Sequence, residues 1–193
     1  MRGWMGLGVV GMIACGSPDA SRGDRVRDVA RDTGDAGAMD CLVGVEVDQC
    51  PSDVSLVDAD GRLRTFSEFR SRPVLVMSTA AWCPGCDALL HELYEWSVSD
   101  APDDLEVLLV ITQSTSGGYA DAESARLYAS FVPDWTVVGD HTGVWNEDWS
   151  GDHGIDQYIY GLLDETGRVM WRRADGRPTT VDEVDQETWG MAE

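Results

Sequence analysis

Apolar runs alternate with helical patterns through the middle of the chain. The segments 73–79 and 105–111 are almost continuously apolar, as is typical of strands buried on both faces of a sheet. Each is followed by a stretch with apolar residues at helical spacing, over 84–96 and over 120–131. The central part of the chain is therefore predicted to run strand, helix, strand, helix.

Shorter elements flank this central part. Residues 54–57 and 62–66 enclose the turn sequence Asp58–Gly61 and are expected to form an N-terminal β-hairpin. Further elements are expected toward the C-terminus: a strand over 135–138, a hairpin over 159–163 and 168–171, and a helix from Thr180 onward. This order predicts an α/β fold with a central mixed sheet flanked by helices.

The segment 139–154 shows no clear periodicity and is rich in acidic and polar residues. Side chains there that are able to bind a metal ion are Asp140, His141, Asn146, Glu147, Asp148, Asp152 and His153. A solvated acidic loop explains the same composition, so no metal ligands are predicted in this segment.

The first forty residues do not have the composition of a packed domain. Arg2 and an apolar stretch, Trp4–Ile13, have the layout of an export signal, and the stretch is far shorter than the roughly 20 residues that span a bilayer. The sequence Met12–Gly16 resembles the lipobox of bacterial lipoproteins, which implies cleavage before Cys15 and lipidation of Cys15. A signal peptide over 1–14 and a flexible tether over 15–40 are predicted.

Charge and composition narrow the function. The chain has 193 residues, 35 of them acidic against 14 basic, and a formal net charge of -21. Such a chain repels nucleic-acid phosphates, so no nucleic-acid partner is predicted. A hydrophobic fraction of 43% is enough for a folded domain, which is placed at 41–193.

The chain has five cysteines, Cys15, Cys41, Cys50, Cys83 and Cys86. Lipidation of Cys15 would leave an even number, and an exported chain works in an oxidising compartment. Cys41 and Cys50 are interpreted as a structural disulfide that closes a small loop. A second redox pair, exchanging with the first, is the alternative that spacing alone leaves open.

The strongest chemical signal is the pair Cys83 and Cys86, which directly follows a predicted buried strand and begins a predicted helix. A helix N-terminus favours negative charge, so a thiolate at Cys83 is stabilised, and Pro84 suits the first helical turn. Cys86 lies one turn further and is within reach of Cys83, as thiol–disulfide exchange requires. A zinc site and an inert structural bridge are the alternatives; a zinc site usually needs further closely spaced ligands.

From these residues a family resemblance follows. The chain resembles the extracytoplasmic thioredoxin-like thiol:disulfide oxidoreductases of the redoxin superfamily over roughly residues 51–185. The segments that carry the resemblance are Leu56–Gly61, Phe66, Pro73–Val76, Ala81–Cys86 and, less specifically, Leu163–Val169. It implies a thioredoxin fold, with Cys83 as the attacking thiol and Cys86 as the resolving thiol.

The resemblance also locates the expected substrate contacts. Trp82, Pro84 and Gly85 surround the dithiol, and alignment places Tyr158 where the family has a cis-proline that shapes substrate binding. Because a cis bond before a non-proline residue costs roughly 2.5–4 kcal/mol, the bond before Tyr158 is expected to be trans.

Other family positions are also altered. Met77 replaces the acidic or amide residue that the family often has six positions before the first Cys. His91 replaces a helix-kinking proline, and is either a proton shuttle or an ordinary helix-surface residue. A peroxiredoxin is disfavoured, because Ala80 stands where that site expects Thr or Ser.

The sequence therefore predicts a thiol:disulfide oxidoreductase that acts on exported protein thiols or disulfides, with a redox partner protein and no cofactor. It is expected on the periplasmic face of a bacterial cell envelope, held at the membrane by lipid on Cys15. The alternatives are a copper-handling protein that uses Cys83, Cys86 and a His, and a non-catalytic thioredoxin-fold binding module.

Overall fold

The structure is a computed structural model that describes residues 41–151 and 158–190. The predicted signal peptide over 1–14, the tether over 15–40 and Cys15 lie outside the described residues, as do Asp152 and His153. Within the described residues, seven strands form one sheet in the order β2-β1-β5-β4-β3-β6-β7. The strands are β1 (Leu56–Asp58), β2 (Leu63–Arg64), β3 (Val74–Ala80), β4 (Glu106–Gln113), β5 (Thr136–Gly139), β6 (Tyr160–Leu163) and β7 (Val169–Arg173).

The centre of the sheet is parallel and its two sides are antiparallel. Strand β4 pairs in parallel with β3 and with β5, while β6 runs antiparallel to β3 and β1 runs antiparallel to β5. All seven residues of β3 are buried, as its continuous apolar run predicts. The predicted α/β fold with a central mixed sheet is confirmed, and this is a thioredoxin-like architecture.

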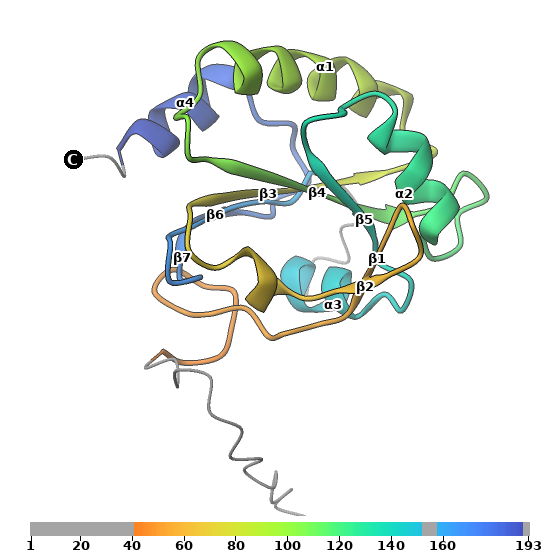
Figure 1. The fold of residues 1–193 in the computed structure, drawn as a ribbon, viewed down its shortest axis with the longest axis horizontal. Coiled ribbons are helices and arrows are strands. Elements are labelled where there is room, and N and C mark those ends of the chain that lie inside the picture. The colour runs from red at the N-terminus through yellow and green to blue at the C-terminus, as the bar shows by residue number, and fades with distance from the viewer. Residues whose placement is uncertain (1–40, 152–157, 191–193) are drawn as a thin grey trace, which may run out of the picture. The chain divides into compact units, whose positions relative to one another are not determined.

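Helices cover both faces of this sheet. They are α1 (Pro84–Ser99), α2 (Ala122–Ala129), α3 (Val144–Ser150) and α4 (Val181–Trp189), with a short 3₁₀ helix, η1 (Phe66–Phe69). Side chains of α1, α2 and α4 share one buried cluster, while α3 and η1 contribute to a second cluster on the other face. Figure 1 shows α1 and α4 on one side of the sheet and α3 on the other. Both faces of the central strands are therefore shielded from solvent.

The predicted N-terminal β-hairpin is present. Leu56 of β1 pairs with Arg64 of β2, and the turn between them is fixed by Asp58, whose carboxylate accepts hydrogen bonds from the backbone N–H groups of Asp60 and Arg62. Gly61 has a φ of 82°, a left-handed conformation that glycine adopts without strain. The hairpin extends the sheet beyond β5 through the pairing of β1.

The predicted loop at 139–154 is wrong in part, because residues 144–150 form helix α3. Trp145 and Trp149 are one helical turn apart, so both indoles lie on the same face of α3, where they are fully buried and stacked at 5.3 Å. Gly161 of β6 leaves room for the Trp149 ring, which any Cβ at that position would overlap. Because acidic residues lie between the two tryptophans, the sequence pattern did not indicate an apolar helix face.

The loop interpretation implied that the side chain of Asp140 is solvated, and this is wrong as well. It is fully buried between β5 and α3, and its carboxylate accepts hydrogen bonds from the backbone N–H groups of Gly143 and Asn146. Burial raises the pKa of Asp140, and the backbone hydrogen bonds partly offset that increase. Asp140 thus organises the start of α3.

Candidate functional site: the dithiol at the start of helix α1

Cys83 and Cys86 are joined in a disulfide at the junction between β3 and α1, with their Cα atoms 5.4 Å apart. Cys83 is the N-cap residue of α1, with an extended backbone, and Pro84 occupies the first helical turn. The Cys83 N–H donates to the Ala80 carbonyl, and the Cys86 N–H donates to the Cys83 carbonyl. The end of the strand and the first turn of the helix thus hold both sulfurs in place.

The two cysteines have different surroundings. Cys83 is 7% exposed and sits at the positive end of α1, where a thiolate is stabilised by the helix dipole. Cys86 is 2% exposed and faces a small pocket lined by side chains of β3 and α1, by Tyr158 and by Tyr160. The attacking role of Cys83 and the resolving role of Cys86, which the family resemblance implies, stay predictions.

Tyr158 lies against the dithiol. Its phenol O–H donates to Cys83 Sγ over 3.6 Å, and its side chain packs in a small cluster with Ala80, Cys83 and Cys86. Tyr158 has a φ of 60°, a left-handed conformation that costs a non-glycine residue about 1–3 kcal/mol. The described residues contain no cis peptide bond; Gln157 lies outside them, so the trans geometry of the bond before Tyr158 stays a prediction.

Tyr158 is held in this position by the residue that follows it. The Ile159 N–H donates to Ser78 Oγ at 3.0 Å, and the Ser78 N–H donates to the Ile159 carbonyl at 2.8 Å. Since Ser78 belongs to β3, two hydrogen bonds tie the segment before β6 to the strand that leads into the dithiol.

Other predicted contact residues lie around the disulfide on the surface. Trp82 is 45% exposed, and its indole N–H donates to Gln113 Oε1 at the end of β4. Pro84 and Gly85 are exposed, and a Cβ on Gly85 would meet only the Tyr158 hydroxyl, at 3.6 Å. The structure therefore gathers all four predicted substrate-contact residues next to Cys83.

Gln113 is a site neighbour that the sequence analysis missed. The sequence did contain a signal for this contact, because two consecutive buried strands are expected to be parallel and their carboxyl ends then meet at one edge of the sheet. In the structure β3 and β4 are parallel, and Gln113 pairs with Ala80. Tyr128 of α2 and Asp87 of α1 were missed as well, because no local pattern connects two different helices. Tyr128 donates a hydrogen bond to Asp87, the residue next to Cys86, at 3.3 Å.

Cys41 and Cys50 form a second disulfide, with Cα atoms 6.0 Å apart. The loop that it closes lies along β7: the Asp48 N–H donates to the Val169 carbonyl, and the Val169 N–H donates to the Gln49 carbonyl. Val169 pairs with Leu163, which pairs with Val74 at the beginning of β3. The dithiol follows the other end of β3, roughly 20 Å along a strand of this length.

His91 and the metal-site alternative find little support in the geometry. His91 is an exposed residue of α1 that lies 3.3 Å from Glu95, one helical turn away. Over residues 41–151 and 158–190, no three His, Cys, Asp or Glu side chains are grouped closely enough to hold a metal ion. In the same residues, no helix has both the length and the apolar character needed to cross a membrane.

Comparison with known proteins identifies the fold of this chain but not its activity. No protein-family model matches the chain. An uncharacterised protein of Haemophilus influenzae is 29% identical over 93 residues, which are 48% of this chain and 59% of that relative's length.

The similar solved structures have thioredoxin-like folds. A secreted disulfide oxidoreductase of Mycobacterium tuberculosis matches with a TM-score of 0.55 and 15% identity, over 72% of this chain and 96% of its own. An exposed lipoprotein thioredoxin of Streptococcus pneumoniae matches with a TM-score of 0.53 and 20% identity, over 72% and 99%. A 2-Cys peroxiredoxin of Plasmodium vivax matches with a TM-score of 0.59 and 14% identity, over 76% and 81%. At these identities the likeness establishes the thioredoxin-like fold of this chain, and the chemistry is argued from the site.

Proposed function

We propose that this protein is a thiol:disulfide oxidoreductase that acts on the thiols or disulfides of exported proteins through Cys83 and Cys86. The observation that carries the proposal is the position of the disulfide, which joins the N-cap residue of α1 to its first turn directly after the buried strand β3. An inert bridge needs neither the helix N-terminus nor the exposed Trp82 beside it. The redox activity of the similar folds is compatible with this site.

The chemistry is a two-step exchange. In the reducing direction the Cys83 thiolate attacks a substrate disulfide, forms a mixed disulfide and releases one substrate thiolate. The Cys86 thiolate then attacks Cys83 Sγ, restores the internal disulfide and releases the second substrate thiolate. The oxidising direction reverses the same bonds, and a redox partner protein resets the pair.

Four residues are proposed to contact the substrate. Trp82 offers an exposed aromatic face, Pro84 and Gly85 form the exposed start of α1, and the phenol of Tyr158 covers Cys83 where the family has its cis-proline. Since the Tyr158 O–H already donates to the Cys83 sulfur, it is able to donate to the thiolate after reduction, which stabilises the charged form.

The test of the function is reduction of insulin disulfides by dithiothreitol, followed by the precipitation of the insulin B chain. The wild-type protein is expected to accelerate this reaction, and loss of the acceleration in the cysteine variants treated in the Discussion assigns it to the dithiol. The reduction potential of the Cys83–Cys86 couple then gives the direction: a value near about −270 mV indicates a reductant and one near about −120 mV an oxidant.

The Cys41–Cys50 disulfide is proposed to be structural. Because it lies at the end of the sheet away from Cys83, direct exchange between the two pairs within one molecule is blocked by the length of β3. The double variant Cys41→Ser/Cys50→Ser is expected to lose about 2–3 kcal/mol of unfolding free energy, the value for closing a loop of about ten residues, and to keep insulin reduction. Urea denaturation and the insulin assay measure the two effects; loss of activity in a folded double variant would show that the pair is redox-active.

A lipid anchor at Cys15 on the periplasmic face of a bacterial envelope is a separate proposal. It rests on the lipobox-like sequence before Cys15, and a lipoprotein thioredoxin is among the similar folds. In a bacterial host, wild-type protein is expected in the membrane fraction and the Cys15→Ala variant in the soluble fraction, because acyl chains supply the membrane binding. Equal release of both proteins into the soluble fraction would contradict lipidation.

A further inference from the structure

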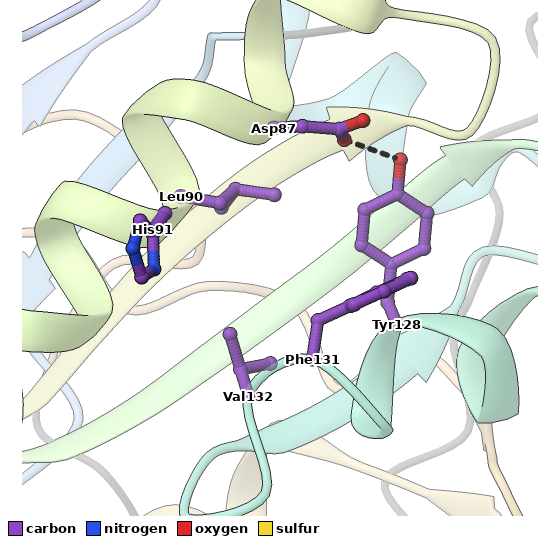
Figure 2. A pocket seen from close by; sticks show the side chains of 6 residues that line it. All are labelled: Asp87, Leu90, His91, Tyr128, Phe131 and Val132. Atoms are coloured by element: carbon purple, nitrogen blue, oxygen red, sulfur yellow. Dashed lines mark hydrogen bonds between the residues drawn. The ribbon is translucent and has the colours of Figure 1, made fainter.

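A pocket of about 230 Å³ lies between α1 and the C-terminal end of α2. The residues that line it are Asp87, Leu90, His91, Tyr128, Phe131 and Val132. Figure 2 shows the α1 side chains on one side of this pocket and Phe131 and Val132 on the other. Its volume is below the roughly 300–1,000 Å³ of typical small-molecule sites. The pocket is therefore suited to one large side chain of a polypeptide rather than to a whole small molecule.

The interior of the pocket is apolar and one of its walls is exposed. Leu90 and Val132 are buried, whereas Phe131 is 65% exposed and packs edge-on against Tyr128, with ring centroids 6.1 Å apart. A single exposed aromatic ring is common on protein surfaces, but this ring borders an apolar hollow. A side chain bound in the hollow would cover the Phe131 ring and remove apolar surface of both groups from water.

The pocket begins one helical turn from the dithiol. Asp87 and Leu90 follow Cys83 by four and seven residues, so all three lie on one stripe of α1. With a rise of about 1.5 Å per residue, Asp87 lies about 6 Å and Leu90 about 10 Å further along the helix than Cys83. An extended chain covers about 3.3–3.6 Å per residue, so these distances correspond to roughly two residues and three to four residues of a bound peptide.

The end of the pocket nearest the dithiol carries negative charge. Asp87 is exposed, and Tyr128 donates to its Oδ1 at 3.3 Å, which holds the carboxylate at the rim. His91 lies 3.3 Å from Glu95, so a second carboxylate stands beside the pocket, and no Arg is among the lining residues. The whole chain has a formal net charge of -21. A cationic group next to the bound apolar side chain is therefore favoured by charge complementarity.

We propose that this pocket is a specificity site for substrate polypeptides, in addition to the contacts around the dithiol. It takes a large apolar side chain about four residues from the reacting substrate cysteine, and Asp87 pairs with a basic residue about two residues from that cysteine. Since side chains of an extended chain alternate between two faces, these two positions face α1 together. The inference rests on the proposed function and names its substrate class.

The probes are four synthetic peptides, each with one cysteine held in a mixed disulfide with nitrothiobenzoate, an aromatic thiol that is coloured when released. The first peptide has Arg two residues and Phe four residues from the cysteine on both sides, so that the direction of binding does not matter. The others replace Arg by Glu, Phe by Ala, or both. The Cys83 thiolate attacks the peptide sulfur, the disulfide bond breaks, and the aromatic thiolate leaves because its thiol has the lower pKa.

Stopped-flow absorbance gives the second-order rate constant of the reduced protein with each peptide. The peptide with Arg and Phe is expected to react about 30-fold faster than the doubly replaced one. About tenfold comes from Phe, the low end for an apolar group in a hydrophobic pocket, and about threefold from the exposed ion pair. The contribution of Arg should disappear in about 1 M salt, where charges are screened within about 3 Å, and that of Phe should remain.

The variants separate the two contributions. Phe131→Ala removes a wall of the pocket and is expected to lower the preference for Phe from about tenfold to about twofold. Asp87→Asn should remove the preference for Arg and keep the preference for Phe. Both positions are exposed, so both variants are expected to fold, which circular dichroism checks. Because each preference is a ratio of two rates on one protein, a changed reactivity of Cys83 cancels.

Trp189→Ala is the matched control. This aromatic residue of α4 is 47% exposed and donates to Asp185, as does Trp96 in the last part of α1, so it lies far along α1 from the dithiol. The control should keep both preferences.

Equal rates of the wild-type protein with all four peptides overturn the specificity site and leave the pocket to another occupant, such as the redox partner. A preference for Phe that persists in Phe131→Ala, or that falls equally in Trp189→Ala, overturns it as well. In each of these cases the oxidoreductase function stands. Release of the coloured thiolate no faster than by Cys83→Ser overturns the proposed function itself, and the specificity site with it.

Discussion

Cys83→Ser is expected to reduce the disulfide-exchange activity of the protein to the uncatalysed level. Cys83 is the only cysteine at the N-cap position of a helix in the described residues, and its sulfur is the one that the Tyr158 hydroxyl contacts. A serine hydroxyl is nearly the same size but does not ionise near neutral pH, so the nucleophile is lost while the packing stays. Insulin reduction by dithiothreitol measures the loss.

The matched control for this variant is Cys41→Ser/Cys50→Ser, which makes the same chemical change at the other disulfide. It is expected to retain activity, so that loss specific to Cys83→Ser identifies the attacking thiol. Insulin reduction at the wild-type rate by Cys83→Ser would show that the assignment of roles is wrong.

Cys86→Ser is expected to convert the protein into a covalent trap. Cys83 keeps its place at the start of α1 and still attacks a substrate disulfide, but no second thiol resolves the product. Mixed disulfides with a disulfide-containing substrate should accumulate at about one per protein molecule and should be reduced on addition of dithiothreitol. Non-reducing gel electrophoresis followed by mass spectrometry of the linked cysteine measures this.

The double variant Cys83→Ser/Cys86→Ser controls for non-specific linkage, and it should form no adducts at this site. Adducts that form through Cys86 in the single variant Cys83→Ser, and not through Cys83 in Cys86→Ser, would reverse the two roles. Trapping also identifies substrates, since the linked partner is released for identification by reduction.

The central fold was readable from the sequence because its signals are local. The apolar runs that became β3 and β4, the helical spacing of α1 and the turn at Asp58–Gly61 are each set by residues that are close together in the sequence. The placement of Cys83 and Cys86 at the strand–helix junction follows from the same signals. Resemblance to a known family added the expectation that Tyr158 faces the dithiol.

Helix α3 shows where local signals failed. Trp145 and Trp149 are spaced for a helix, but the acidic residues around them and the short length of the segment made a loop equally reasonable. What stabilises α3 is non-local: Trp149 stacks on Phe66 at 6.0 Å and fits against Gly161, and both residues are distant in sequence. Burial against those partners outweighs the weak helical tendency of the segment itself.

The sequence alone therefore determined the order of the elements other than α3, the α/β class and the dithiol, because each depends on residues that are neighbours in the chain. The tertiary structure alone decided which residues surround that dithiol. It brought the Tyr158 hydroxyl to Cys83, the Gln113 side chain to Trp82, and the Tyr128 phenol to Asp87, and it placed the Cys41–Cys50 loop at the opposite end of the sheet. Each of these contacts joins separate elements, and its position follows from how strands pair and helices pack rather than from any pattern within one segment.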